Sequence, residues 1–492
     1  MKLKSRKAGI LMPIASLPNA YGVGDFGFSA YRFVDLIKEG GFSLWQILPI
    51  NPIAYGHSPY QPYSSFAIEP LYISLEKLHE KGLLDEVPSF NKEKERIDYE
   101  AARAYKMPYL YEAYQEEMRR NRSCLRTFIK EHPWVVDYAA YMTFKEEEGG
   151  SSWHLWGKRK RDWASGTRVL NSKEKDTFNF YVWLEKTLFA QWHELHAYAK
   201  SKGVSIIGDI PFYVGFDSAD VWANQKYFLL DKESKEPSFV AGCPPDYFSK
   251  TGQRWGNPIY NWDLLEKTDF AFLQERILRS AEIYDIIRLD HFRAFDTYWK
   301  VPSSCPTAEI GDWIEAPGYA FFDSLLERKP DLAIIAEDLG MLREEVYELR
   351  DHYHFPGMNV IEFTFHDAEI EKKEGWNKEN MVCYIGTHDN DPLKGYLEKM
   401  DAEEKEKWAL ALEKMKAKGK NIEEQLLYYA FSRKCAYTIV SLQDLLLLDS
   451  SSRINEPGLV NEINWTWRLK DYEGVEGALL AFRHLIEETG RI

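Results

Sequence analysis

The sequence predicts an α/β fold, specifically a (β/α)8 TIM barrel with large helical and loop insertions around its C-terminal mouth. Short apolar runs, rich in β-branched residues, alternate with longer segments of helical periodicity, as expected for parallel strands covered by helices on both faces. Eight runs are present, which is the number a barrel needs. The predicted strands cover residues 9–14, 44–48, 204–207, 283–289, 332–336, 359–363, 381–385 and 437–442.

Acidic residues end four of these strands, at Asp209, Asp290, Glu337 and Asp389. Parallel strands in a βα barrel end at the same rim, and the active sites of such barrels lie at the C-terminal ends of the strands. We therefore interpret the four carboxylates as parts of one site and not as four separate structural acids.

The strands are unevenly spaced, which predicts insertions in a single barrel that spans residues 1–492. The interval between residues 48 and 204 is far longer than one crossover helix needs, so we expect a mainly helical inserted subdomain at about 76–200. A second insertion, at about 212–270, is rich in Pro, Gly and aromatic residues. We expect it to form a long loop region over the active site.

The amino-acid composition of the chain limits the classes of partner that it can bind. A formal net charge of −15 argues against nucleic-acid and anionic-membrane partners, because both would be repelled. Aromatic residues make up 15% of the chain, and such rings suit the apolar faces of sugars, although a large core also uses them. Five scattered cysteines without a C-x-x-C pair indicate free thiols in a reducing compartment.

Three partial matches to known motifs bear on the location and cofactors of the protein, because each is incomplete. The basic, then apolar N-terminus imitates an export signal, but Pro13 interrupts it and no clean cleavage site follows, so we expect a cytoplasmic protein. The G-x-G-x-x-G match at 22–27 has no strand directly before it and no acid at the end of the next strand, and a dinucleotide site requires both. His193-Glu194-Leu195-His196 does not have the H-E-x-x-H spacing of a zincin metal site. No metal or organic cofactor is expected.

The positions of the carboxylates predict their chemistry. Arg288 and Asp290 share one face of a strand, so the guanidinium should keep Asp290 ionised and able to act as a nucleophile. Glu337 ends the next strand, about 4.8 Å away, where the neighbouring charge should keep it protonated as a general acid. Carboxyl groups about 5 to 5.5 Å apart predict retention at a sugar carbon through a covalent intermediate. Asp338 faces the other way and should be structural, whereas Asp389 could bind sugar hydroxyls more strongly in the transition state.

Several motifs together resemble a known family. Gly208-Asp209-Ile210-Pro211 and the stretches 288–295, 336–340 and 387–391 resemble the four signature regions of the α-amylase superfamily. The stretches 58–61, 244–249, 252–258 and 464–468 more specifically resemble the amylomaltase family, the 4-α-glucanotransferases. The likeness extends from about residue 9 to residue 468, and the eight segments occur in the family's order.

The resemblance implies roles for individual residues. Asp290 would be the nucleophile, Glu337 the acid/base and Asp389 the stabiliser of the transition state. Residues that would bind substrate are Tyr55, Ser58, Tyr60, Asp209, Asp246, Tyr247, Phe248, Trp255, Arg288 and His388. The family uses no metal or organic cofactor, and its substrates are malto-oligosaccharides and other α-1,4-glucans, with glucose as an acceptor.

Two positions depart from the family pattern and leave the shape of nearby loops open: Pro392, where the family commonly has Thr, and Cys243, just before the Pro-Pro loop. The expected activity is a retaining 4-α-glucanotransferase. The alternatives are a retaining α-glucan hydrolase, since the carboxylates do not determine whether water or sugar accepts the glycosyl group, and a catalytically inactive glucan-binding protein.

Overall fold

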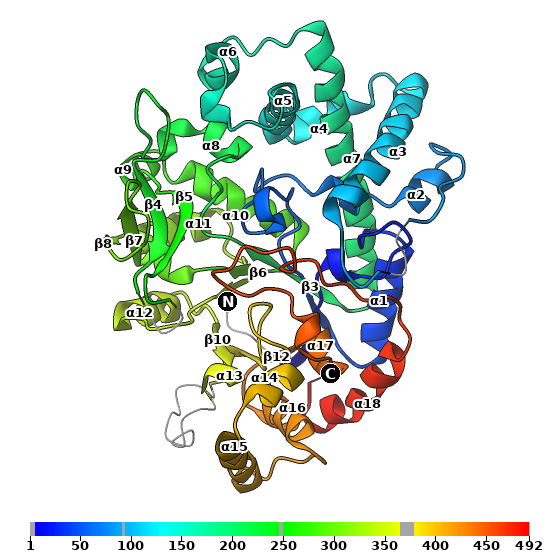
Figure 1. The fold of residues 1–492 in the computed structure, drawn as a ribbon, viewed down its shortest axis with the longest axis vertical. Coiled ribbons are helices and arrows are strands. Elements are labelled where there is room, and N and C mark those ends of the chain that lie inside the picture. Colours follow the sequence, from blue (N-terminus) through cyan, green and yellow to red (C-terminus); the bar gives the residue numbers. More distant parts are fainter. Residues whose placement is uncertain (1–4, 91–93, 246–248, 365–377, 492) are drawn as a thin grey trace.

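A computed structural model describes residues 5–90, 94–245, 249–364 and 378–491 of the chain. Eight parallel strands form its central sheet (Figure 1), in the order β10-β11-β12-β1-β2-β3-β6-β9. This is the order of the strands along the chain, read as a circle, so the predicted barrel is confirmed. The strands are β1 (Lys7–Leu11), β2 (Leu44–Gln46), β3 (Ser205–Ile210), β6 (Ile286–Leu289), β9 (Ile334–Ala336), β10 (Gly357–Val360), β11 (Met381–Tyr384) and β12 (Tyr437–Ser441).

All eight observed strands differ from the predicted ranges at one end or both, and β6 and β10 show the physical reason. β6 begins at Ile286 because the preceding helix α10 (Ala271–Ile283) extends through the first residue of the predicted run. β10 begins at Gly357, which pairs with Met381, and the chain turns into the short helix α13 (Ile361–Thr364) where we predicted continued strand. An apolar run alone does not separate the end of a helix from the start of a strand.

Helices surround the sheet on its outer side (Figure 1). The longest, α7 (Ser172–Ser201), begins with a capping box in which Asn171 and Glu174 satisfy each other's backbone groups, and it packs against β3 and α1. The other helices beside the barrel are α1 (Phe28–Glu39), α10, α11 (Gly318–Arg328), α12 (Glu344–His352), α14 (Leu393–Lys399), α15 (Ala402–Lys414), α16 (Ile422–Ser432), α17 (Leu442–Leu445) and α18 (Val475–Glu488).

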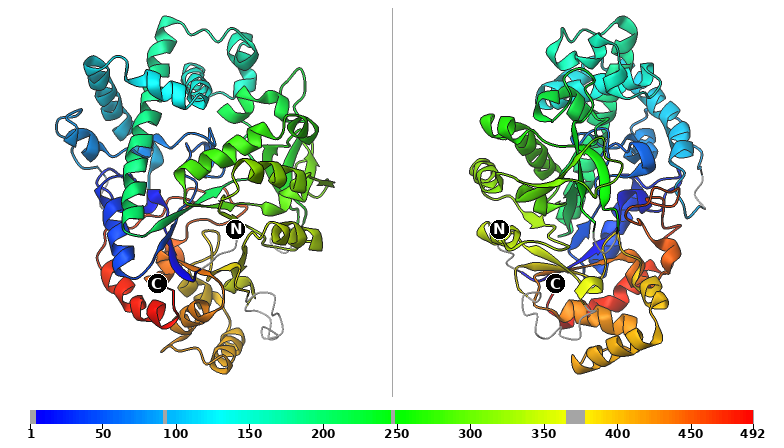
Figure 2. Two further views of the ribbon diagram at one scale, coloured as in Figure 1. Left: turned by 180° about the vertical axis from the view of Figure 1, so that it is seen from behind. Right: turned by 60° about the vertical axis from the view of Figure 1, so that its left-hand side comes forward.

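The chain between β2 and β3 forms a group of helices at one end of the long axis of the molecule (Figures 1 and 2). α5 (Trp134–Glu147) packs on α4 (Cys124–Glu131) and α7, and α3 (Tyr99–Arg120) packs on α7, so α7 joins this group to the barrel. We propose that the group is a single inserted subdomain. Its helices before α7 are α2 (Leu75–Glu80), α3 (Tyr99–Arg120), α4 (Cys124–Glu131), α5 (Trp134–Glu147) and α6 (Lys158–Arg161).

A second, antiparallel sheet stands beside the barrel, with the order β5-β4-β7-β8. Its strands are β4 (Phe239–Cys243), β5 (Gln253–Pro258), β7 (Thr297–Pro302) and β8 (Asp312–Glu315). The segment 212–270, expected as loops, therefore contains two strands in addition to the helices α8 (Ala219–Ala223) and α9 (Trp262–Lys267). Gly256 and Pro258 lie within β5, and such residues argue against a strand when the sequence is read alone.

The barrel closes between β9 and β10 with the help of a side chain. Ala336 N donates to Pro356 O at 2.9 Å, and two residues further the Asp338 carboxylate accepts from Met358 N at 2.8 Å. Arg350 on α12 forms an ion pair with the same carboxylate, and both side chains are buried. Asp338 therefore takes the place of a backbone carbonyl at the seam.

Removal of this carboxylate should destabilise the whole protein. Asp338→Ala leaves the Arg350 guanidinium buried without its main partner, and we expect a loss of about 3 kcal/mol in the free energy of unfolding, because a broken buried ion pair leaves an uncompensated charge. Urea unfolding followed by circular dichroism measures it. Asp331→Ala, at a carboxylate whose side chain is 83% exposed, is the control and should change stability little. Equal stability of the two variants would contradict the role of Asp338 at the seam.

Candidate active site

Arg288, at the C-terminal end of β6, joins two of the predicted carboxylates. Its Nη1 donates to Asp209 Oδ2 at 2.6 Å and to Asp290 Oδ1 at 3.0 Å. The register of the sheet brings these groups together, because Asp209 on β3 pairs directly with Arg288 on β6. The Arg288 and Asp209 side chains are buried, whereas that of Asp290 is 29% exposed. The guanidinium thus lies beneath the rim, and Asp290 faces the open side.

Tyr60 covers this ion pair from the loop that follows β2. Its hydroxyl donates to Asp209 Oδ2 at 2.7 Å, and its ring stacks on His388 with centroids 5.2 Å apart and an interplanar angle of 16°. Trp465 packs against both rings. Burial, together with the Asp209 charge, raises the pKa of Tyr60 well above its usual range. The phenol therefore stays protonated and serves as a hydrogen-bond donor.

Glu337, directly after β9, is held by backbone donors. His291 N donates to Glu337 Oε2 at 2.8 Å, and Leu339 N donates to Oε1 at 3.2 Å. His291 has a left-handed backbone with φ 52°, which turns the chain after Asp290 towards Glu337. Neighbouring strands β6 and β9 therefore present Asp290 and Glu337 at adjacent positions on the rim.

The site holds more carboxylates than cations, which affects their protonation. Burial raises the pKa of Glu337, and burial together with the charges of Asp209, Glu337 and Asp389 raises that of Asp290. The Arg288 guanidinium opposes both shifts. Buried carboxyls with a common neighbourhood do not all ionise near neutral pH, so the site is suited to hold and exchange a proton.

Asp389 is positioned by a segment from the end of the chain. Asn455 Nδ2 donates to Asp389 Oδ1 at 2.6 Å, and Arg453 Nη2 donates to the Asp389 carbonyl at 2.7 Å. His388 Nε2 lies 3.4 Å from Asp389 Oδ2, and burial lowers the pKa of His388. The Asp389 side chain is 42% exposed, so it remains accessible from the rim.

The second sheet contributes Trp255, on β5, to the same rim. Its ring meets His291 edge-on with centroids 4.9 Å apart, and Gln61 Nε2 ties the Tyr60 loop to Asn257 Oδ1 at 2.8 Å. Ser58 Oγ accepts from Tyr60 N at 3.2 Å, which shapes this loop. Of the remaining predicted residues, Asp246, Tyr247 and Phe248 lie outside the described part of the chain, as does the side chain of Tyr55.

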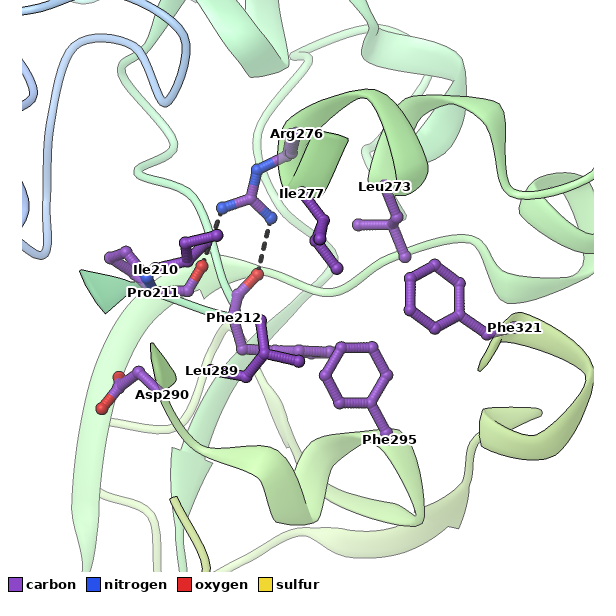
Figure 3. Close-up of a pocket in the computed structure, with 10 residues that line it drawn as sticks. All are labelled: Ile210, Pro211, Phe212, Leu273, Arg276, Ile277, Leu289, Asp290, Phe295 and Phe321. Carbon is purple, nitrogen blue, oxygen red and sulfur yellow. Dashed lines mark hydrogen bonds between the residues drawn. The ribbon is translucent and has the colours of Figure 1, made fainter. Parts of the chain in front are cut away.

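Behind Asp290 lies a small apolar cavity of about 10 Å³ (Figure 3). The Asp290 carboxylate points away from it, whereas Leu273, Ile277 and Phe321 face it. On its polar side the buried Arg276 donates to Pro211 O at 2.7 Å and to Phe212 O at 2.8 Å, as Figure 3 shows. Arg276 thus fixes the turn after Asp209, and the cavity is a packing gap and not a binding site.

Sequence reasoning missed three residues of the rim: His291, Asn455 and Trp465. His291 and Trp465 lie inside the stretches 288–295 and 464–468, which resemble the family, so their neighbours were the available signal. Asn455 had none, because its contact with Asp389 joins residues 66 positions apart. The two departures from the family pattern are accommodated: Pro392 directly precedes α14 with φ −54°, and Cys243 ends β4.

The described residues include no group of three or more His, Cys, Asp or Glu side chains arranged to hold a metal ion. Nor does any helix in the described ranges have the length and apolar character needed to cross a membrane.

Comparisons with known proteins agree over nearly the whole chain. Residues 12–473 match a family model described as 4-alpha-glucanotransferase. The 4-alpha-glucanotransferases of Aquifex aeolicus and Thermus thermophilus are 42% and 39% identical, covering 95% and 99% of this chain and 96% and 99% of their own. A solved amylomaltase from Streptococcus agalactiae, in complex with acarbose, is 35% identical, with a TM-score of 0.91 over 99% of both chains.

Loss of the central guanidinium should change the pH dependence of any activity at this site. Arg288→Met removes the cation that lowers the pKa of Asp290, so the carboxyl ionises only at higher pH. We expect turnover to fall roughly 100-fold or more near neutrality, because the group that must be ionised stays protonated. The acid limb of the pH–rate profile should move to higher pH.

The profile of kcat/KM over pH, measured for both proteins, checks this prediction. Arg328→Met is the matched control, because this guanidinium is 42% exposed on α11 and pairs there with Glu275. An acid limb at the same pH in Arg288→Met and in the unaltered protein would contradict the prediction.

Proposed function

This chain belongs to the 4-alpha-glucanotransferase family, and from this premise we propose how its own residues transfer a glucan segment. The donor is a malto-oligosaccharide or another α-1,4-glucan, and the acceptor is the 4-hydroxyl of a second glucan or of glucose. The observation that carries the proposal is Arg288 bridging Asp209 and Asp290, with Glu337 at the adjacent strand end.

In the first step, an oxygen of the ionised Asp290 attacks the anomeric carbon of the donor, and the bond from this carbon to the glycosidic oxygen breaks. Glu337 gives its proton to that oxygen as the leaving glucan departs. We assign the shared proton to Glu337 because the guanidinium contacts Asp290 directly, whereas Glu337 receives only backbone donors. The donor segment is then held as an ester of Asp290.

In the second step, the 4-hydroxyl of the acceptor attacks the same carbon, and its proton passes to the Glu337 carboxylate. The ester bond to Asp290 breaks, so both groups return to their starting states. Two displacements at one carbon retain its configuration. Asp389, held by Asn455, binds hydroxyls of the distorted sugar more strongly in the transition state.

The remaining rim residues bind the glucan in this proposal. Tyr60 and Trp255 offer their rings, and the buried His388 supports the Tyr60 ring on which it stacks. We propose that Ser58, Tyr55, Asp246, Tyr247 and Phe248 also contact the glucan, as the family resemblance implies. Asp209 acts through Tyr60 and Arg288, because its own side chain has no exposed surface. We further propose that the protein works in the cytoplasm, where its five cysteines, none of which forms a disulfide, stay reduced.

The two carboxyl groups should differ in how completely their loss stops the reaction. Asp290→Ala removes the nucleophile, so turnover should be abolished. Glu337→Gln keeps the shape but has no proton to give, and it should lose about 10²- to 10⁴-fold in kcat. Initial rates of maltotriose disproportionation measure both. Near-normal rates in either variant would overturn the assignment of the roles.

Maltotriose also separates transfer from hydrolysis. Transfer lengthens some products and shortens others without changing the number of reducing ends, whereas hydrolysis increases it. We expect longer oligosaccharides and glucose at a constant reducing-end count, measured by chromatography and a reducing-sugar assay on one sample. A steady rise in reducing ends without longer products would identify a hydrolase, and binding without any turnover would identify an inactive glucan-binding protein.

A further inference from the structure

An exposed tryptophan, Trp313, lies on the edge strand β8 of the second sheet. It pairs with Trp299 on β7, and the two rings are tilted by 58° with centroids 5.2 Å apart. Trp299 is anchored by a hydrogen bond from Nε1 to Ala308 O at 2.9 Å. Trp313 keeps 40% of its surface exposed. The ring is thus packed against an anchored neighbour but remains partly exposed to solvent.

Arg293 holds the Trp313 ring and connects it to both catalytic loops. Its guanidinium carbon lies 3.7 Å from the ring centroid, and Nη1 donates to Met341 O at 3.0 Å. Arg293 follows Asp290 by three residues, and Met341 follows Glu337 by four. The Trp313 ring therefore contacts the loop of the proposed nucleophile directly and reaches the loop of the proposed acid/base through Arg293.

Trp313 and Met341 differ from ordinary exposed apolar residues. Single exposed apolar side chains are common on protein surfaces and need no explanation. Here the Met341 side chain, which is 91% exposed, lies on the loop that Arg293 joins to the Trp313 ring. The Arg293 Nε is buried without a hydrogen-bond partner among the described residues, so the flat stacking geometry costs a polar contact. A fixed, partly exposed ring, linked through Arg293 to a loop that carries an exposed and flexible apolar side chain, suits the C–H face of a glucose unit.

We propose that Trp313 and Met341 form an additional glucosyl-binding subsite on the acceptor side of the cleft, beyond the units next to the reacting bond. This inference rests on the proposed function. The acceptor side is assigned because Glu337 protonates the leaving oxygen, and the incoming 4-hydroxyl takes the place of that oxygen. Met341 lies on the Glu337 loop, so a long acceptor that leaves the site in this direction reaches the Trp313 ring, whereas glucose does not.

The test compares acceptors of different length at a saturating concentration of one unlabelled donor, maltotriose. Labelled glucose and labelled maltohexaose are the acceptors. In Trp313→Ala we expect the KM for maltohexaose to rise roughly three- to tenfold, as the loss of one ring-stacking contact predicts. The KM for glucose and both kcat values should stay unchanged. Trp313→Phe retains a ring and should recover most of the affinity for maltohexaose.

Phe28→Ala is the matched control, since this ring is 75% exposed on α1 but has no link to the catalytic loops through Arg293. It should leave both KM values unchanged. Unchanged KM values in Trp313→Ala, or an equal rise for glucose and maltohexaose, would overturn the subsite, because an equal rise indicates a structural role. If the unaltered protein transferred to neither acceptor, both this inference and the proposed function would be wrong.

Discussion

The site is organised around one buried guanidinium between two carboxylates. Arg288 pairs with Asp209 beneath the rim and with Asp290 at its surface. A buried cation requires counter-charges, and the parallel register of β3 and β6 supplies Asp209 directly opposite. Tyr60 then donates a second hydrogen bond to Asp209 Oδ2, and the ring of Tyr60 determines where His388 and Trp465 pack. The need to compensate the charge of the Arg288 guanidinium thus determines how the side chains of the rim are arranged.

The carboxylates that end four of the strands could be predicted because they depend on local properties. A short apolar run followed by Asp or Glu reports both a strand and its polar end, and the barrel geometry then brings these ends together. The helical character of the segment before α7 also followed from periodicity. The family resemblance supplied the order of the motifs, and the comparisons confirmed it.

Features that depend on distant partners could not be predicted. Asn455 holds Asp389 across 66 residues, and nothing in its neighbourhood marks it as part of the rim. β4 and β5 form a sheet with β7, which comes from a different connection of the barrel, and Gly256 and Pro258 conceal the β5 strand. The left-handed backbone of His291 likewise accompanies a distant contact, because His291 N donates to Glu337 Oε2, 46 residues away.

The seam of the barrel has a consequence for how the enzyme fails under stress. Asp338, whose side chain closes the barrel between β9 and β10, is the immediate neighbour of Glu337. Any opening of the cylinder at this junction displaces the proposed proton donor in the same event, while Arg288 on β6 keeps its partner Asp209 on β3. Closure of the barrel and the position of Glu337 therefore depend on each other, because one peptide bond joins Glu337 to Asp338. Inactivation should precede the loss of helical structure, and glucan held across the rim should delay both.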